Sequence, residues 1–186
     1  MNNLMNMDAF DAFPVLTTPR LHLRSIELKD ADAIWQMRAN NRVNEFIARP
    51  KMDNQDDAKK LVEKTLAAYK NKLAIGWAGE LKNTSSIIGT CGFNNIDIPN
   101  LRAEIGGEMA TEYWGKKLAL EAVVAIIDFG FNNLKLHTIE AKVMPDNKSA
   151  IYVLEQLGFI KEAHFKDRIF FNSNFFDMAV YTLISK

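Results

Sequence analysis

The stretch TEYWGKKLALEAV, residues 111–123, combines three features that suit the binding of an anion. Gly115 lets a ligand approach the backbone closely, because it has no side chain. Lys116 and Lys117 add positive charge, and the apolar residues that follow predict a helix whose first amide groups lack internal partners. The stretch therefore predicts a phosphate-binding turn. The alternative, a solvated helix start after a glycine turn, stays open at this point.

A second group of residues with chemical potential lies in RAEIGGEM, residues 102–109. Strand alternation places Ala103, Ile105 and Met109 on one face, and Arg102, Glu104, Gly106 and Glu108 on the other. A charged face in a sheet that is covered by helices indicates a solvated cleft. Glu104 is the candidate general base, acting on an amine directly or through a water. The alternative is an ion pair between Glu104 and Arg102 with no catalytic role.

Composition limits the classes of function that these residues can serve. Of 186 residues, 23 are Lys or Arg and 23 are Asp or Glu, so the zero net charge predicts no general affinity for nucleic acid or an anionic membrane. A single cysteine, Cys91, excludes an internal disulfide and a cysteine-based zinc site, and the histidines show no metal-ligand spacing. The sequence has no membrane-spanning run and no secretory signal. We therefore expect a cytoplasmic protein without a metal.

The elements that must position these residues alternate between strands and helices. Period-two patterns predict strands over 20–27, 73–81, 86–96, 102–109, 137–143 and two C-terminal runs. Helical spacing predicts helices over 29–41, 54–70 and 147–157, and a long helix that the turn in 111–123 opens and that ends near residue 132. Residues 1–16 are expected to form an N-terminal tail and residues 17–186 a single domain. This order predicts one α/β sandwich around a central sheet.

In this order and spacing, the motifs resemble those of the GNAT superfamily of acetyl-coenzyme A-dependent N-acetyltransferases. From LTTPRLHLRSI to the C-terminus, the matching pieces are IIGTCGF, RAEIGGEM, EYWGKKLALEAV, IEAKVMPDNKSAIYVLEQLGF and DMAVYTL. The most similar branch includes ribosomal-protein N-terminal (alanine or serine) acetyltransferases. The resemblance implies a mixed, mostly antiparallel sheet that splays between the strands at 102–109 and 138–143, with acetyl-coenzyme A in the splay.

The resemblance also implies which residues bind the cofactor. The backbone amides of Trp114, Gly115, Lys116, Lys117, Leu118 and Ala119 are expected to hold the pyrophosphate of coenzyme A. Amides around Met109 and Ala110 are expected to bind the thioester oxygen or the pantetheine arm. Asn147 matches an asparagine that binds the pantetheine arm, and it also suits the N-cap of its helix.

One position in the phosphate turn departs from the family pattern, because Lys117 stands where the family has glycine. We expect Lys117 in right-handed helical geometry, which does not require glycine, so that its amide points at phosphate and its side chain adds a charged contact. The alternative is that its Cβ obstructs the cofactor.

The resemblance implies that a primary amine attacks the thioester directly, with no covalent enzyme intermediate. Ala150 and Leu154 stand where relatives often have a serine and a tyrosine near the thiolate, so the proton donor stays unassigned and solvent is sufficient. The implied acceptor is a protein N-terminus, ribosomal or other, with a small amine (polyamine, amino acid or antibiotic) or a non-catalytic acyl-coenzyme A-binding role as alternatives. Either a monomer or a homodimer fits this reading.

Overall fold

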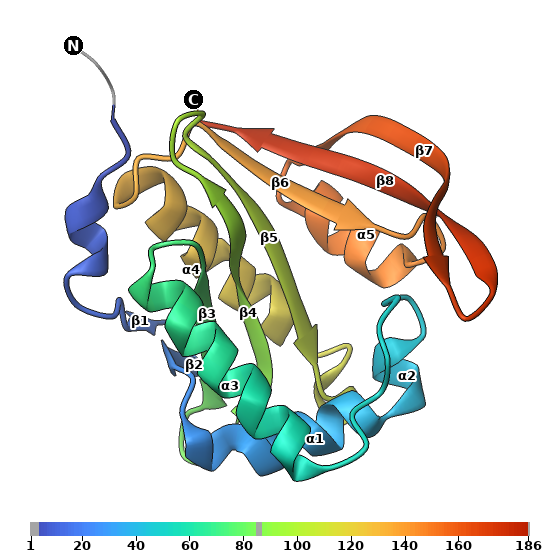
Figure 1. Cartoon of the computed structure of the whole chain (residues 1–186). Coiled ribbons are helices and arrows are strands. Elements are labelled where there is room, and N and C mark those ends of the chain that lie inside the picture. Colours follow the sequence, from blue (N-terminus) through green and yellow to red (C-terminus); the bar gives the residue numbers. More distant parts are fainter. Residues whose placement is uncertain (1–3, 85–86, 186) are drawn as a thin grey trace.

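The computed structural model describes residues 4–84 and 87–185, which form one eight-stranded sheet flanked by helices (Figure 1). The sheet has the order β1-β2-β3-β4-β5-β6-β8-β7. Its strands are β1 (Leu16–Thr17), β2 (Leu21–Ser25), β3 (Ile75–Leu81), β4 (Ile87–Asp97), β5 (Arg102–Met109), β6 (Thr138–Val143), β7 (Ile160–Phe171) and β8 (Asn174–Ile184). The helices are α1 (Ala31–Ala39), α2 (Asn41–Asn44), α3 (Gln55–Lys70), α4 (Leu118–Asn132) and α5 (Lys148–Gln156). The expected mixed α/β sandwich is confirmed.

The parallel pair β5 and β6 interrupts an otherwise antiparallel sheet in the described part of the chain. These two strands pair only from Arg102 with Thr138 to Glu104 with Glu140. Beyond Glu104 they diverge, although β5 continues to Met109 and β6 to Val143 (Figure 1). The expected splay is therefore confirmed, and the strand edges inside it carry backbone groups that no ladder satisfies.

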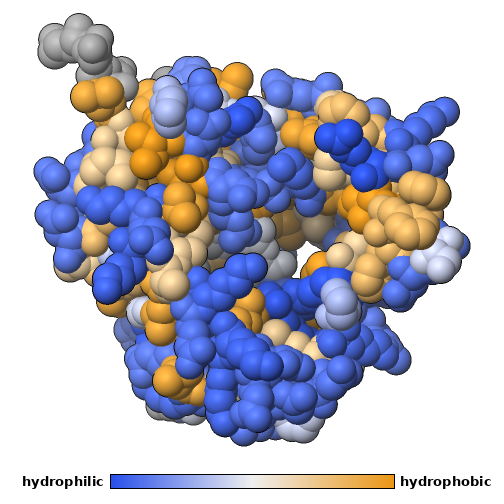
Figure 2. All heavy atoms as spheres, in the orientation of Figure 1, coloured by the Kyte–Doolittle hydropathy of each residue, from blue (hydrophilic) through white to orange (hydrophobic). Residues whose placement is uncertain are grey.

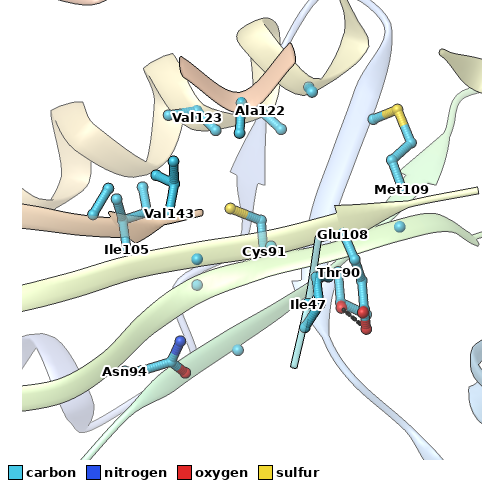
Figure 3. A pocket seen from close by; sticks show the side chains of 18 of the residues that line it. Ile47, Thr90, Cys91, Asn94, Ile105, Glu108, Met109, Ala122, Val123 and Val143 are labelled. Carbon is cyan, nitrogen blue, oxygen red and sulfur yellow. Dashed lines mark hydrogen bonds between the residues drawn. The ribbon is translucent and has the colours of Figure 1, made fainter. Parts of the chain in front are cut away.

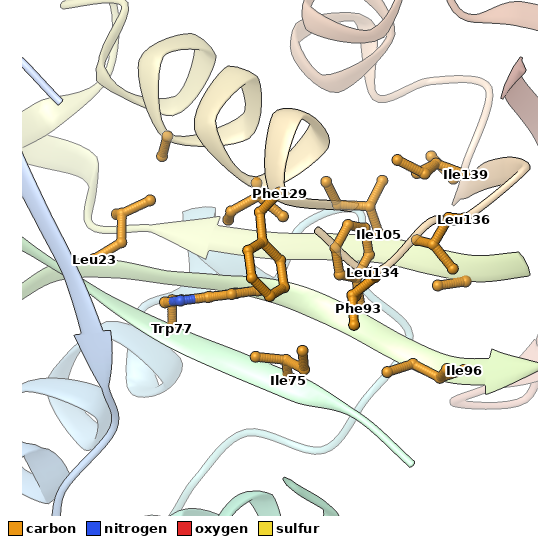
Figure 4. Packing of buried hydrophobic residues seen from close by; sticks show 14 of the residues in the cluster. Leu23, Ile75, Trp77, Phe93, Ile96, Ile105, Phe129, Leu134, Leu136 and Ile139 are labelled. Carbon is orange, nitrogen blue, oxygen red and sulfur yellow. The ribbon is translucent and has the colours of Figure 1, made fainter. Parts of the chain in front are cut away.

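Helices cover both faces of the sheet, with α4 on one side and α1 and α3 on the other (Figure 1). The α4 side holds the larger core, in which Trp77 is fully buried. The Trp77 ring meets the rings of Phe93 and Phe129 edge-on, at centroid distances of 6.1 Å and 5.6 Å (Figure 4). Strand alternation sends the next residue, Ala78, to the smaller core under α1 and α3. No helix in residues 4–84 and 87–185 has the length and apolarity needed to cross a membrane.

Local sequence explains why α4 lies where it does. Ala122, Ile126 and Phe129 recur at helical spacing and are buried against the sheet. Residues 111–113 form a separate 3-10 turn, and α4 begins at Leu118. The phosphate turn predicted from the sequence therefore lies between this 3-10 turn and the first residues of α4.

The segment predicted as a tail packs on the domain from residue 4 onward, and residues 1–3 and 186 lie outside the described residues. Met5 and Phe10 are buried in the core of the α4 side. The Tyr69 hydroxyl donates to the Phe10 carbonyl at 3.0 Å, and the Trp77 ring nitrogen donates to the Pro14 carbonyl at 2.7 Å. The boundary between tail and domain at residue 17 stays a prediction.

Deletion of residues 1–13 tests that boundary. Because it exposes the surface that Met5 and Phe10 cover, we expect the free energy of unfolding to fall by at least about 2 kcal/mol, given about 1.5–3 kcal/mol per large buried side chain less the ordering entropy. Urea unfolding measures the change, with Leu4→Ser as a control because Leu4 is 75% exposed. An unchanged unfolding midpoint for the deletion variant would identify a dispensable tail.

Candidate active site

A cavity of about 670 Å³ occupies the splay between β5 and β6. Figure 3 shows that it passes from one face of the sheet to the other: Cys91 and Met109 point toward Ala122 and Val123 of α4, whereas Thr90, Asn94 and Glu108 point to the opposite face. Two molecules that approach from opposite faces could therefore meet between the strands.

The turn before α4 presents a set of free backbone amides at the α4 side of this cavity. In the described residues, the amides from 115 to 119 make no hydrogen bond, and Ala119 lines the cavity. Gly115 and Lys117 both have positive φ, at 74° and 59°. A turn of this kind followed by a helix N-terminus forms a concave surface that suits an anion.

The expected right-handed geometry of Lys117 is wrong. Lys117 has φ 59° and ψ 17°, which is left-handed, and it occupies the N-cap of α4. At this point the chain reverses from the turn into the helix, and that reversal requires positive φ. A side chain here costs about 1–2 kcal/mol relative to glycine, which accounts physically for glycine in the family pattern. The Lys117 side chain is exposed and is not part of the cavity wall.

An ion pair from a distant strand holds the turn in place. The Arg20 side chain donates to Glu121 of α4 at 2.7 Å and to the Lys116 carbonyl at 3.0 Å. Glu121 also accepts from the Thr18 hydroxyl at 2.6 Å. Burial acts to raise the pKa of Glu121, but the bonds from Thr18 and Arg20 outweigh it and lower the pKa. The carboxylate therefore stays ionised and ties α4 to the start of β2.

Aromatic rings support the same turn from the other side. The Trp114 ring nitrogen donates to the Met109 carbonyl at 2.8 Å, and the guanidinium of Arg42 lies 5.1 Å from the Trp114 ring centre. The Lys116 ammonium lies 5.3 Å from the Tyr113 ring centre. These contacts connect the end of β5, the turn and α2.

Backbone alternation decides which amides of β5 face the splay. The Ala110 amide already donates to the Ile88 carbonyl of β4 at 2.9 Å, so it is not available to a ligand. Neighbouring residues of a strand direct their amides to opposite edges, so the Met109 amide points away from β4, toward the splay. Of the two amides expected from the sequence to bind the cofactor, that of Met109 is therefore the one free to do so.

Asn147 serves as the N-cap of α5, where its side-chain oxygen accepts from the Ala150 amide at 3.0 Å. It also lines the cavity, together with Ala150 and Leu154 of the same helix. The capping interpretation of Asn147 is thus supported directly, and its contact with the pantetheine arm stays a prediction.

Glu104 pairs with Lys142 across the splay and not with Arg102. The Lys142 ammonium lies 2.6 Å from the Glu104 carboxylate, and the Asn95 amide donates to the same oxygen at 3.3 Å. Arg102 instead contacts Asp97 at 2.9 Å and Glu140 at 3.1 Å, so the alternative of a Glu104–Arg102 pair is wrong. Lys142 lines the cavity, whereas Glu104 is not among the residues of its wall.

Glu108 is the acidic residue that the cavity wall contains and that sequence reasoning did not select. Its side chain is 3% exposed and accepts from Arg38 at 2.6 Å. Arg49 forms a second ion pair with it, and the Thr90 hydroxyl bonds the carboxylate at 3.3 Å (Figure 3). Strand alternation placed Glu108 on the same face as Glu104, but no local signal identified its two arginine partners.

Cys91 contributes a thiol to the cavity wall without the character of a nucleophile. Burial raises its pKa to about 12, so the thiol stays protonated at neutral pH. Within residues 4–84 and 87–185, no group of three or more His, Cys, Asp and Glu side chains is arranged to hold a metal ion. The polar groups that the cavity wall presents are carboxylate, guanidinium, ammonium, amide and hydroxyl groups.

Comparison with known sequences places this fold and cavity in one family. The acetyltransferase (GNAT) domain family matches residues 20–160, and the chain belongs to this family of acetyltransferase enzymes. It is 36% identical to the uncharacterized N-acetyltransferase p20 of Bacillus licheniformis, over 92% of this chain and 96% of that protein. It is 24% identical to the spermidine N(1)-acetyltransferase of Vibrio cholerae, over 90% of this chain and 95% of that protein.

Solved structures agree with this placement. The ribosomal-protein-S5-alanine acetyltransferase of Vibrio fischeri is 28% identical, with a TM-score of 0.80 over 92% of this chain and 96% of that chain. RimL, a ribosomal L7/L12 alpha-N-protein acetyltransferase in complex with coenzyme A, has a TM-score of 0.85 over 92% of this chain and 98% of that chain. At 19% identity, the likeness to RimL shows the fold alone.

Lys117→Gly tests the geometry of the turn. Glycine removes the left-handed strain, so the free energy of unfolding should rise by up to about 1 kcal/mol. Coenzyme A affinity should fall by about 0.5–1.5 kcal/mol if the Lys117 side chain reaches phosphate. Urea unfolding and calorimetric titration measure the two effects. Lys116→Gly is the matched control, because Lys116 has no positive φ and should lose stability instead. Tighter coenzyme A binding by Lys117→Gly would show that the side chain obstructs the site.

Proposed function

We propose that this enzyme transfers acetyl from acetyl-coenzyme A to the N-terminal amine of a peptide or protein. The proposal rests on one observation: the central cavity is continuous with a second groove on the surface. The central cavity shares Ile47, Ala48, Arg49 and Met144 with a second groove of about 420 Å³. An acceptor with atoms on both sides of Arg49 fits this path better than a compact amine does.

The α4 side of the cavity supports a coenzyme A site. Free amides between residues 115 and 119 offer an anion-binding turn for the pyrophosphate. Met109 and Asn147 line the wall from there to the splay, where a pantetheine arm would find the unpaired edge of β5. RimL, which shares the fold, was solved with coenzyme A bound.

The opposite side supports an extended acceptor. The second groove lies between residues 41–51 and the β7–β8 turn, and its polar lining includes Asn41, Asn44, Asn172 and Asn174. Figure 2 shows the molecular surface hollowed between the α1–α2 side and the side that carries β6, α5 and β8. An extended peptide advances about 3.3 Å per residue, so the groove would take the residues that follow the reacting amine.

Charge makes a polyamine a poorer fit. Of the described residues that line the central cavity, Glu108 is the one carboxylate, and Arg38 and Arg49 already occupy it. Lys142, the remaining charged residue of that wall, adds a further positive charge. A polyamine would bring several ammonium groups to a site with no unpaired carboxylate, and like charges repel there.

The proposed chemistry is direct aminolysis of the thioester. The neutral amine forms a bond to the carbonyl carbon, and the Met109 amide stabilises the oxygen as it gains negative charge. Collapse then breaks the carbon–sulfur bond, the nitrogen loses its proton to a base, and solvent protonates the thiolate. We retain Glu104 as the proposed base, acting through a water beside Lys142. The cytoplasmic location and the monomeric or homodimeric state remain predictions.

Acceptor assays test the proposal. We expect thiol release from acetyl-coenzyme A with peptides that carry a free N-terminal alanine or serine, and mass spectrometry should place the acetyl group on the α-amine. Matched peptides with a blocked N-terminus and an internal lysine serve as controls, and spermidine is the rival substrate. Turnover of spermidine with no turnover of any peptide would overturn the proposal. The absence of a thermal shift with millimolar acetyl-coenzyme A would contradict the proposed binding of this cofactor.

Glu104→Gln and Glu108→Gln form a matched pair that locates the base. The two residues share a face of β5 and lie about 13 Å apart along an extended strand, so one amine cannot use both. If Glu104 is the base, Glu104→Gln should lower kcat about 10²–10⁴-fold at neutral pH, with a smaller loss at higher pH. Glu108→Gln should mainly change KM for the acceptor. The reverse pattern in the two pH–rate profiles would assign the base to Glu108.

A further inference from the structure

The acceptor side of the cavity contains two arginines that share one carboxylate. Arg38 of α1 and Arg49 of the loop after α2 both contact Glu108, and all three side chains are at least four-fifths buried. Arg38 and Glu108 lie 2.6 Å apart. One negative charge against two positive charges leaves this triad with a net charge of +1. The other basic residue of the cavity wall, Lys142, has its own partner in Glu104.

The arginines retain hydrogen-bond donors after these contacts. Arg38 donates through its Nε to Glu108, and Arg49 donates through its Nε to Asn44 at 2.8 Å. One terminal nitrogen of Arg49 forms an ion pair with Glu108 but no hydrogen bond. In the described part of the chain, the other terminal nitrogens of both guanidinium groups have no hydrogen-bond partner. A guanidinium presents five N–H groups in a planar fork that matches a carboxylate.

Burial has the largest effect on the pKa of Arg49. Burial lowers the pKa of Arg49, the charge of Glu108 acts against that shift, and the charge of Arg38 adds to it. The net direction is downward because burial is the largest effect. The excess positive charge of the triad follows instead from its composition, two guanidinium groups and one carboxylate. The second groove, which we call the outer groove, does not correct this charge imbalance, because Glu45 and Lys51 there carry opposite charges.

We propose that Arg38 and Arg49 form a subsite for a carboxylate on the acceptor, so that the preferred substrates are peptides with Asp or Glu close behind the reacting N-terminal residue. This inference rests on the proposed function. A carboxylate that enters the subsite completes the charge balance of the triad and accepts charge-assisted hydrogen bonds. It contributes binding and specificity, and takes no part in the chemical step.

The position of the triad sets where the acidic residue falls. Glu108 directly precedes Met109, whose amide faces the splay, and Arg49 lies where the two hollows join. A peptide with its amine in the splay passes Arg49 on its way to the outer groove. Three extended residues span about 10 Å, so the acidic side chain belongs within the second to fourth positions of the peptide.

A panel of hexapeptides with N-terminal serine tests the subsite. Aspartate is placed at position two, three or four, and each peptide is compared with its asparagine and lysine counterparts by kcat/KM. We expect at least one aspartate peptide to exceed its asparagine counterpart about tenfold, equivalent to about 1.4 kcal/mol. The preference should shrink as ionic strength rises, because salt screens charges that solvent reaches.

Variants assign the preference to the arginines. Arg49→Gln and Arg38→Gln should each reduce the aspartate-to-asparagine ratio toward one, whereas Lys51→Gln, which removes a charge from the outer groove alone, should preserve it. Thermal shift with acetyl-coenzyme A checks that each variant folds, and the salt dependence of the wild-type preference provides a test that needs no variant.

The outcomes separate the subsite from the proposed function. Peptides that are acetylated equally well whatever their charge would overturn the subsite and leave the proposed function intact. Spermidine turnover without peptide turnover would overturn both. Free aspartate or glutamate accepted as efficiently as the best peptide would support a carboxylate subsite but overturn its assignment to a peptide side chain.

Discussion

The early separation of β5 and β6 is the constraint on which the site depends. The two strands are joined by the crossover helix α4, as parallel neighbours must be, but they share only the pairs from Arg102 to Glu104. Past Glu104, each strand keeps one edge of unpaired backbone groups, and unpaired groups that are withdrawn from water require partners. The divergence thus creates both a space and the hydrogen-bonding groups that line it, without a specialised loop.

The same crossover places an anion-binding turn beside that space. Because α4 begins shortly after β5 ends, the helix N-terminus and the free edge of β5 face the same cavity. The turn is strained at Lys117, and its position is maintained by contacts from outside the crossover. Arg20, which directly precedes β2, contacts Glu121 and the Lys116 carbonyl. The conformation of the turn, which local residues form, is thus stabilised by a segment about one hundred residues away in the sequence.

Buried charges are balanced in different ways at the two ends of α1. Arg24 donates hydrogen bonds to two carboxylates, Asp30 at 2.8 Å and Glu80 at 2.7 Å, and its hydrogen bond with Asp30 leads the effects that raise its pKa. At Glu108 the ratio is reversed, with two arginines for one carboxylate. The first arrangement is a satisfied structural network next to the smaller core. The second leaves charge in a cavity wall, which is the physical basis for expecting an anionic group there.

Local patterns in the sequence were sufficient for the order of elements, the family motifs, the Gly-Lys turn and the capping role of Asn147, because period, caps and turns are governed by neighbouring residues. The same patterns could not give the left-handed geometry of Lys117, which follows from how the chain enters a helix whose position is set by packing. They could not assign Glu104 to Lys142, 38 residues away, or Glu108 to Arg38, 70 residues away. Strand register and ion pairing depend on which distant segments meet, so only the tertiary structure decided the partners, and with them the charge, of the proposed acceptor site.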